Sequence, residues 1–403
     1  MSYKPKKYLI KTLGCQANVA DSNTMSGILE SLGFEEFKTD KVFKNEKEEL
    51  LDILPQVDLF VINTCSVRQK SEDKVYGLGK VTSLLNDKKK SVPFTIISGC
   101  MVGSVTGSRQ RYKFEILKKK TPWANEYMNP SQIFDLPKIL HENQLLDEWA
   151  IKKYSPENVE AIQPEKEHAF VNISYGCDNF CTFCVVPYAR GQEVSRTEKE
   201  ILFEVKHLAN KGYKKITLCG QNVNSWGMSM KDKFEIRTGS DQKIPFADLL
   251  NKVHAIETIE KIDFISSNPF DFTKDLVETI KLPKISNYIH IAVQSGNNEV
   301  LKNMNRRHTV EEFENLIEEI KIAKPDVEFG TDVIVGFPGE TRDQFFDTVK
   351  LFERIVFKVA FISMYSPRKG TPAEKFFKDD VSLKEKKWRH NKLTEVWKKT
   401  KNE

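Results

Sequence analysis

The sequence lacks any long apolar run. No stretch of its 403 residues approaches the roughly 18 consecutive apolar residues that a membrane-spanning helix needs. The N-terminus has no apolar segment of the kind that directs secretion, and no internal repeat or low-complexity tract occurs. These absences argue against membrane, secreted and repeat proteins. With 39% apolar and 30% charged residues, we expect two or three soluble domains in the cytoplasm.

The cysteines do not form a disulfide pattern. There are seven of them, an odd number in a large chain without a secretion signal. Metal binding or catalysis is therefore the better expectation. The cysteines stand at positions 15, 65, 100, 177, 181, 184 and 219.

The charge balance is only mildly basic. Lysine and arginine number 62 against 57 aspartates and glutamates, a net charge of +5 that permits a nucleic-acid partner without requiring one. Basic runs occur at Lys88–Lys90 and Lys118–Lys120, and again between Lys384 and Lys401. Each run is compatible with ordinary solvated surface and with contact to phosphate groups.

Three apolar runs in the first part of the chain each lead directly to a cysteine. The pairs of run and cysteine are 8–13 with Cys15, 57–62 with Cys65, and 94–97 with Cys100. Helical patterns at 21–32 and 66–85 separate the runs, and alternating strands and helices predict a parallel sheet. Ligands gather beyond the carboxyl ends of the strands in such sheets, so we expect these cysteines to converge there.

A polar stretch with Pro156 and Pro164 separates this part from the next and is expected to be a linker. After it, the expected strands are 169–175, 215–220, 261–267, 288–294, 327–335 and 358–364. Helices follow most of them, and Thr197–Glu200 and Thr309–Glu312 are capping boxes that start two of these helices. Six consecutive β/α units fit a partial barrel better than a closed barrel of eight.

The expected fold class is therefore α/β, with a parallel-sheet domain followed by a partial barrel. The expected division is an N-terminal domain at 1–150, a linker at 151–167, a barrel at 168–380 and a basic C-terminal helix at 381–403.

Cysteines are most concentrated directly after the first expected barrel strand. Cys177, Cys181 and Cys184 lie within eight residues, a spacing that lets one loop wrap around a cubic iron–sulfur cluster. Three thiolates leave one iron of such a cluster without a protein ligand. A structural zinc site favours a fourth cysteine or histidine nearby, and none follows at zinc-finger spacing. A cluster is therefore favoured over zinc and over three unrelated cysteines.

This triplet, with Phe183 before its last cysteine, resembles the signature of the radical S-adenosylmethionine (SAM) enzymes. The resemblance extends over nearly the whole chain and narrows to the methylthiotransferases. Segments 11–18, 62–67 and 98–101 resemble the three cysteine motifs of the methylthiotransferase N-terminal domain. Further similar segments are 185–196, 220–226, 293–296, 304–309 and 332–341. Among them, 185–193 and 220–226 are most similar to the branch that acts on isopentenyl-adenosine in tRNA.

The resemblance implies two [4Fe-4S] clusters and SAM as cofactors. The six cysteines divide into an N-terminal trio, Cys15, Cys65 and Cys100, and a loop trio, Cys177, Cys181 and Cys184. In this family the loop trio holds the cluster that cleaves SAM, and the N-terminal trio holds a second cluster that carries or delivers sulfur. SAM serves both as methyl donor and as radical source. A radical is needed because polar chemistry cannot readily replace hydrogen on an unactivated adenine carbon.

The same resemblance places SAM at the carboxyl ends of the barrel strands. The residues that match this position are Gln221, Ser266, Ser267, Gln294, Ser295 and Asp332. Each of them also fits ordinary capping at a strand end. Phe183 would pack near the adenine of SAM, or would pack within the protein without contacting SAM. Gly336 and Gly339 suit a tight turn near the cofactor, or only a strand-to-helix turn.

Several residues in or near the family motifs have two interpretations. Cys219 is expected to be a small buried residue on a strand, with a weaker alternative role at a cluster. His290 and His308 are expected to be structural histidines. Arg190, Arg306 and Arg307 are candidate contacts to tRNA or ribose and also fit surface ion pairs.

The sequence departs from the family pattern in several places. Forty-nine residues separate Cys15 from Cys65, which is longer than usual. Ala292 stands where proline is common, and Asn268 stands where histidine is common. The family normally continues into a small RNA-binding β-barrel (TRAM), and none is evident before Glu403.

The function implied by the resemblance is 2-methylthiolation of isopentenyl-adenosine in tRNA. An alternative keeps the chemistry and changes the substrate to threonylcarbamoyl-adenosine in tRNA or an aspartate of a ribosomal protein. A third hypothesis is a non-catalytic, metal-stabilised RNA-binding module. The expected partners of the enzyme are the tRNA, an electron donor such as flavodoxin or ferredoxin, and a sulfur source, with no membrane.

Overall fold

The described part of the chain folds into two units. The computed structural model describes residues 5–66, 69–155, 159–163, 165 and 167–402. The N-terminal unit comprises Met1–Pro164 and Val185–Gln192, and the C-terminal unit comprises Glu165–Cys184 and Glu193–Glu403. This division differs from the expected one because 185–192 belongs to the N-terminal unit. Pro156 and Pro164 of the expected linker lie outside the described residues.

The N-terminal unit is built on a five-stranded parallel sheet with the order β2-β1-β3-β4-β5. Its strands are β1 (Lys7–Leu13), β2 (Glu35–Glu36), β3 (Leu59–Thr64), β4 (Phe94–Gly99) and β5 (Glu126–Met128). Its helices are α1 (Gln16–Ser31), α2 (Glu46–Ile53), α3 (Gln69–Asp87), α4 (Cys100–Thr106), α5 (Phe114–Lys120), α6 (Leu136–Glu142), α7 (Glu148–Lys153) and α8 (Val186–Ala189). Two 3-10 turns are η1 (Leu54–Gln56) and η2 (Pro130–Asp135).

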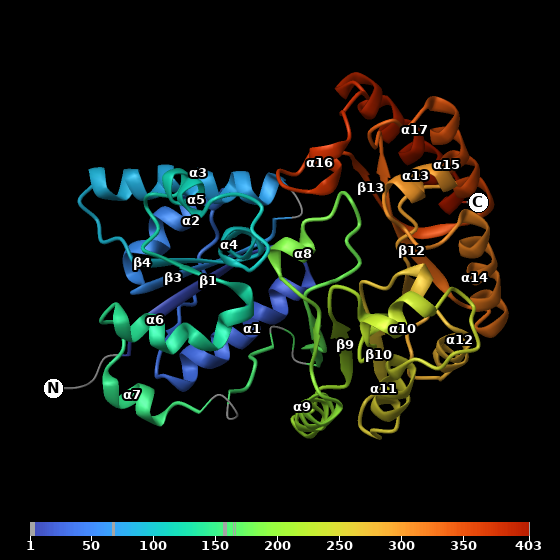
Figure 1. Cartoon of the computed structure of the whole chain (residues 1–403). Helices are drawn as coiled ribbons and strands as arrows, with labels where there is room; N and C mark the ends of the chain where they lie inside the picture. The colour runs from blue at the N-terminus through green and yellow to red at the C-terminus, as the bar shows by residue number, and fades with distance from the viewer. Residues whose placement is uncertain (1–4, 67–68, 156–158, 164, 166, 403) are drawn as a thin grey trace. The chain divides into compact units, whose positions relative to one another are not determined.

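Alternate side chains of the central strands enter two separate cores, as expected for a sheet covered on both faces. On β3, Leu59 and Val61 pack with residues of α1 and α6. Phe60 and Ile62 of the same strand pack with residues of α2, α3 and α5. Figure 1 shows α1 and α6 on one face of this sheet and α3 and α5 on the other. The long segment between the first two cysteines contains α2.

The C-terminal unit contains six parallel strands that follow the chain order. They form two three-stranded sheets, β10-β9-β6 and β11-β12-β13, which the parallel bridge between Ser267 and Ile291 links. The strands are β6 (His168–Asn172), β9 (Lys215–Cys219), β10 (Lys261–Phe264), β11 (Tyr288–His290), β12 (Glu328–Val335) and β13 (Phe357–Met364). A short antiparallel pair is β7 (Ser174–Tyr175) with β8 (Val194–Ser195). The expected α/β fold with a six-unit partial barrel is confirmed.

Helices lie between these strands along the chain, and most of them share one core with the strands. The helices are α9 (Glu198–Asn210), α10 (Met230–Glu235), α11 (Pro245–His254), α12 (Lys274–Ile280), α13 (Asn298–Asn303), α14 (Val310–Ala323), α15 (Arg342–Arg354), α16 (Pro372–Phe376) and α17 (Leu383–Asn402), with the 3-10 turns η4 (Val223–Ser225) and η5 (Pro269–Asp271). Helix α16 packs instead in a smaller separate core. Both expected capping boxes are present, at the starts of α9 and α14.

The last helix, α17, packs on the barrel. Leu393 is fully buried in the core, and Trp397 Nε1 donates a hydrogen bond of 2.8 Å to the Phe357 carbonyl of β13. None of the described helices is both long enough and apolar enough to cross a membrane.

Candidate functional site

The N-terminal trio lies at one edge of the N-terminal sheet. Cys15 follows β1, Cys65 follows β3 and Cys100 follows β4. These three strands are neighbours, and their last residues are partners in register. Adjacent strands are about 4.8 Å apart, so the fold brings together three cysteines that are far apart in sequence, as expected.

Cys65 and Cys100 are in direct contact. The hydrogen bond with Cys65, together with the positive charge of Arg190, holds the pKa of the Cys100 thiol below its usual value despite complete burial. Gly99 precedes Cys100 with a φ of +90°. A Cβ atom at that position would lie 2.4 Å from the Thr64 carbonyl oxygen. Glycine is therefore required for the turn that places Cys100 at the start of α4.

A buried polar network supports Cys15. The Asn18 carboxamide oxygen lies 3.4 Å from the Cys15 amide and 3.5 Å from its sulfur. Asn18 Nδ2 donates to Asn63 Oδ1 at 2.9 Å, and Asn63 Nδ2 donates back to the Asn18 carbonyl at 2.8 Å. Both asparagines are fully buried. Sequence reasoning missed this network, although Asn18 and Asn63 both stand inside the cysteine motifs.

Arg190 is not displayed on the surface as a contact to RNA would be. It is 6% exposed and follows α8 in the N-terminal unit. Its Nη2 lies 2.7 Å from Asp21 Oδ2, and its Nε lies 3.3 Å from Cys100 Sγ. The structure thus places a buried ion pair beside the N-terminal trio.

The loop trio occupies a loop of the C-terminal unit that a neighbouring segment holds in place. Thr182 donates from its amide to the Met304 carbonyl at 3.1 Å and from its hydroxyl to the Asn303 carbonyl at 2.8 Å. Asn305 donates to the carbonyls of Asn179 and Phe180. These contacts fix the loop on both sides of its second cysteine, Cys181.

A second arginine reaches a sulfur of this loop. Arg306 Nη1 lies 3.4 Å from Cys181 Sγ, and its Nη2 donates to the Ala292 carbonyl at 2.7 Å. Arg306 is 8% exposed, so it also differs from the expected surface contact. Its neighbour Arg307 pairs with the buried Asp271 at 3.0 Å.

Burial raises the pKa of the Cys177 thiol well above its usual value, and the charges of Glu193 and Cys184 add to this shift. Glu193 itself is buried beside Lys233, with 2.7 Å between Oε1 and Nζ. It also accepts a hydrogen bond from Ser225 at 2.5 Å. A cysteine binds iron only after losing its proton, so assembly of a cluster on Cys177 would release protons.

Of the residues expected to contact SAM, Gln221, Ser266 and Gln294 follow the ends of neighbouring strands, whereas Asp332 lies within β12. Ser266 and Gln294 have φ angles of +68° and +73°. Such backbone conformations cost about 1–3 kcal/mol in residues other than glycine and cluster at functional sites. Asp332 is 43% exposed and lies 2.7 Å from His290. Gln221 is half-buried just after β9.

Three other candidates have partners within the fold. The Ser267 hydroxyl donates to the His290 carbonyl, and the Ser295 hydroxyl accepts the Asn297 amide at 3.3 Å. Phe183 packs against a small core that includes Met304. Their observed contacts are those of capping and packing.

The remaining motif residues have structural contacts. Cys219 is fully buried at the end of β9. His308 is 4% exposed and packs near aromatic rings. Gly336 and Gly339 have φ angles of +69° and +81° in the turn between β12 and α15, as a strand-to-helix turn requires.

The donor sets fit iron–sulfur clusters. Each trio offers three cysteine sulfurs, the usual protein ligands of such clusters. In addition, each trio has one arginine N–H group aimed at a sulfur. Among the described residues, no three His, Cys, Asp or Glu side chains are placed to hold a single metal ion. In a cubane cluster each cysteine binds a different iron, so its ligands need not converge on one point.

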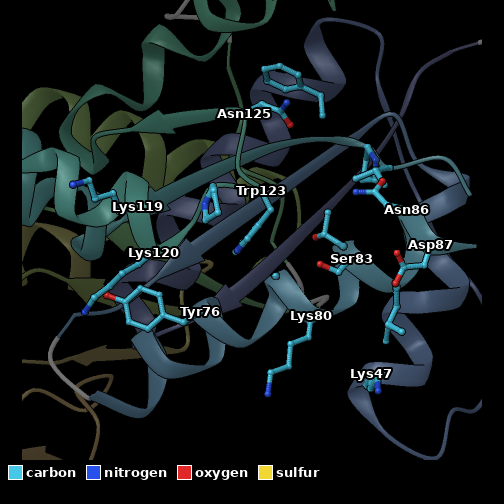
Figure 2. Close-up of a pocket in the computed structure, with 17 residues that line it drawn as sticks. Lys47, Tyr76, Lys80, Ser83, Asn86, Asp87, Lys119, Lys120, Trp123 and Asn125 are labelled. Carbon is cyan, nitrogen blue, oxygen red and sulfur yellow. The ribbon is translucent and has the colours of Figure 1, made fainter. Parts of the chain in front are cut away.

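A separate groove of about 1040 Å³ lies along α3 in the N-terminal unit. It includes Phe94, the first residue of β4, and therefore reaches the sheet edge opposite to the N-terminal trio. Four lysines line it, with one carboxylate, Asp87. The lysines are Lys47, Lys80, Lys119 and Lys120. Figure 2 shows Lys119 and Lys120 on one side, Lys47 on the other and Trp123 between them.

Comparison with protein families gives two matches. Residues 171–352 match the radical SAM superfamily, and residues 7–119 match the uncharacterized protein family UPF0004. Among solved structures, the radical SAM methyltransferase TsrM from Kitasatospora setae matches with a TM-score of 0.58 and 12% identity, covering 92% of this chain and 77% of that one. The cobalamin-dependent SAM radical enzyme OxsB matches with a TM-score of 0.56 and 12% identity, covering 98% and 56%. These two likenesses show the fold.

Curated relatives are much closer in sequence. The tRNA-2-methylthio-N(6)-dimethylallyladenosine synthase of Clostridium botulinum is 38% identical over 396 residues, covering 97% of this chain and 81% of the relative. The enzymes of that name from Thermoanaerobacter pseudethanolicus and Protochlamydia amoebophila are also 38% identical, covering 91% and 97% of this chain and 72% and 80% of the relatives. The chain therefore belongs to the family of the tRNA-2-methylthio-N(6)-dimethylallyladenosine synthases, within the radical SAM superfamily.

Proposed function

We propose that this protein adds a methylthio group to carbon 2 of isopentenyl-adenosine, also called dimethylallyladenosine, in tRNA. The observation that carries the proposal is the presence of two separate cysteine trios, each with an arginine N–H group on one sulfur. The names of the relatives support this substrate over threonylcarbamoyl-adenosine and over a ribosomal aspartate. A cytoplasmic location fits a tRNA substrate.

The two trios would hold one [4Fe-4S] cluster each. The cluster of the loop trio would supply the electron that cleaves SAM, and that of the N-terminal trio would supply an open iron for sulfur. Cys177, Cys181 and Cys184 would bind iron from their loop, which hydrogen bonds with Asn303 and Asn305 hold in place. In each trio, the arginine that donates a hydrogen bond to one cysteine sulfur would fix the orientation of that cysteine.

SAM would lie over the strand ends of the C-terminal unit. Gln221, Ser266, Gln294 and Asp332 have exposed or half-exposed side chains or strained backbones there. Asp332 would orient an amine or hydroxyl group of SAM through its free oxygen, because its other oxygen is bonded to His290. The buried hydroxyls of Ser267 and Ser295 would keep the strand ends in register.

The lysine-lined groove supports contact with the tRNA. Four ammonium groups and one carboxylate give it a net positive charge, which suits the phosphate backbone. Lys120 also lies 4.9 Å from the centre of the Tyr76 ring. The two basic runs at 88–90 and 118–120 adjoin or enter this groove. An external reductant and a sulfur source complete the expected partners.

The test is an anaerobic assay of the iron–sulfur-reconstituted chain with SAM, reductant, sulfide as the sulfur source and isopentenylated tRNA, read by nucleoside mass spectrometry. We expect 2-methylthio-isopentenyl-adenosine together with 5′-deoxyadenosine. Absence of both products from a chain that holds its full iron content would overturn the proposal.

Single cysteine variants separate the two trios. Cys181→Ala is expected to abolish 5′-deoxyadenosine formation, whereas Cys65→Ala is expected to retain it and to stop methylthiolation. Cys219→Ala is the matched control, because this buried cysteine lies outside both trios, and it should retain both products. Full methylthiolation by Cys65→Ala would contradict the assignment of two clusters.

A further inference from the structure

Two buried arginines each donate to one cysteine sulfur, one in each unit. The donor–acceptor distances are 3.3 Å for Arg190 Nε to Cys100 Sγ and 3.4 Å for Arg306 Nη1 to Cys181 Sγ. Both arginines are less than one-tenth exposed. Hydrogen bonds from a charged donor are stronger than neutral ones, and burial weakens their screening by water.

Packing fixes the position of Arg190. It stands directly after α8, which packs on α4 so closely that a Cβ atom at Gly103 would lie 1.8 Å from the Ala189 carbonyl oxygen. Cys100 is the first residue of α4. The backbone contact between these two helices therefore sets the distance from the Arg190 guanidinium to the Cys100 sulfur.

The two arginines differ in how their charge is compensated. Arg190 forms a 2.7 Å ion pair with Asp21, which is 1% exposed. Among the ion pairs of the described residues, none includes Arg306. Its other contacts are the Ala292 carbonyl and the Phe270 ring, whose centre is 4.9 Å from the guanidinium carbon. The positive charge beside Cys181 is therefore not offset by a bonded carboxylate, whereas the charge beside Cys100 is.

We propose that Arg190 and Arg306 are positioning residues that set the reduction potentials of the two clusters separately, and that Asp21 offsets the effect of Arg190. The proposal rests on the proposed function, in which each trio holds a cluster. Reduction adds one electron to a cluster, and hydrogen bonds to its sulfurs and positive charge nearby stabilise the reduced form. Each arginine therefore raises the potential of its own cluster, and the Asp21 carboxylate lowers that of the N-terminal cluster.

The experiment uses two full-length parent chains that each retain one trio. One parent carries Cys177→Ala, Cys181→Ala and Cys184→Ala, and the other carries Cys15→Ala, Cys65→Ala and Cys100→Ala. Each parent is reconstituted anaerobically, its iron content is measured, and its cluster is titrated against potential by electron paramagnetic resonance. The readout is the ratio of oxidised to reduced cluster at a fixed potential, which does not depend on turnover.

In the parent with the N-terminal trio, Arg190→Met is expected to raise the oxidised-to-reduced ratio at least tenfold, which is 59 mV for a one-electron couple. Asp21→Asn is expected to lower the same ratio, because it leaves the arginine charge without its counter-charge. Arg306→Met is the matched control in this parent and should leave the ratio unchanged. In the parent with the loop trio, Arg306→Met is expected to raise the ratio and Arg190→Met is the control that should leave it unchanged.

The decisive result is that Arg190→Met and Asp21→Asn shift the oxidised-to-reduced ratio in opposite directions. General loosening of the site would shift the ratio in the same direction for both variants. Shifts of the same sign, or no shift in the matching parent, would overturn the inference. If Arg190→Met loses iron, Asp21→Asn decides alone: a lowered ratio supports the inference and an unchanged or raised one overturns it. Parents that bind no iron would instead count against the proposed function.

Discussion

Arg389 of α17 and Glu340 of the turn after β12 form a buried ion pair, with 2.7 Å between Nη1 and Oε2. Glu340 also accepts the Gly336 amide at 2.6 Å, and Arg389 donates to the Glu340 carbonyl at 2.8 Å. Both side chains are at most 4% exposed. The pair therefore ties the last helix to the glycine turn at the end of β12.

Replacing Arg389 by Met is expected to destabilise the C-terminal unit strongly. It leaves the Glu340 carboxylate buried without its counter-charge, which costs about 3–5 kcal/mol of unfolding free energy. Urea denaturation of the full chain, followed by circular dichroism, measures this change. Lys392→Met on the same helix is the control, because the side chain of Lys392 is 39% exposed and its ion pair with Glu395 is 3.9 Å long. Equal losses for both variants would contradict the prediction.

The stability of the protein is expected to fall below pH 6.5 because of His308. Burial, followed by the charge of Arg306, lowers the pKa of His308 well below its usual value. The folded side chain therefore stays neutral while the unfolded one takes up a proton. The contribution of His308 to stability is complete above the unfolded pKa of about 6.5 and falls by at most about 1.4 kcal/mol per pH unit below it.

The measurement is the unfolding free energy of wild type and His308→Gln at pH 7.5 and pH 5.5. The loss between the two pH values should be smaller in the variant, since glutamine does not titrate. The same pH dependence in both proteins would show that His308 is not the group responsible.

Charge reversal in the lysine-lined groove is expected to weaken tRNA binding. Lys80→Glu with Lys120→Glu should lower the affinity for isopentenylated tRNA at least tenfold. The salt dependence of this affinity should also fall, because each lost phosphate contact reduces the slope of log K against log salt by roughly 0.7–0.9. Filter binding at several salt concentrations measures both quantities. Lys138→Glu with Lys152→Glu is the matched control on exposed lysines of α6 and α7. A similar loss of affinity in both double variants would mean that tRNA binding depends on the net charge of the protein and not on this groove.

The sequence was sufficient for features that depend on local pattern. Parallel strands ending in cysteines predicted where Cys15, Cys65 and Cys100 meet, because the carboxyl ends of such strands share one edge. It was not sufficient for Arg190 and Asp21, which are 169 residues apart. Their pairing depends on 185–192 joining the N-terminal unit, and no periodic pattern in the sequence predicts that this segment does so. The edge strand β2, only two residues long, also carries too little pattern to be recognised.

Two glycines on helices of the N-terminal unit are expected to respond oppositely to alanine. A Cβ atom at Gly103 of α4 would lie 1.8 Å from the Ala189 carbonyl oxygen, whereas one at Gly77 of α3 would meet nothing within 4 Å. Gly103→Ala should therefore push α8 away from α4, cost about 1–3 kcal/mol and move Arg190 away from Cys100. Gly77→Ala should raise the free energy of unfolding by about 0.5–1 kcal/mol, because alanine loses less conformational freedom than glycine on folding.

Unfolding free energy and iron content together distinguish the two glycine variants. Gly103→Ala is expected to lose iron from the N-terminal trio in a chain that lacks the loop trio, because displacement of α4 also moves its first residue, Cys100, while Gly77→Ala retains it. A Gly103→Ala chain with normal stability and iron content would mean that α8 does not determine the position of Arg190. In that case the bond from Arg190 to Cys100 would depend on Asp21 alone, because the ion pair is the other contact that holds the guanidinium in place.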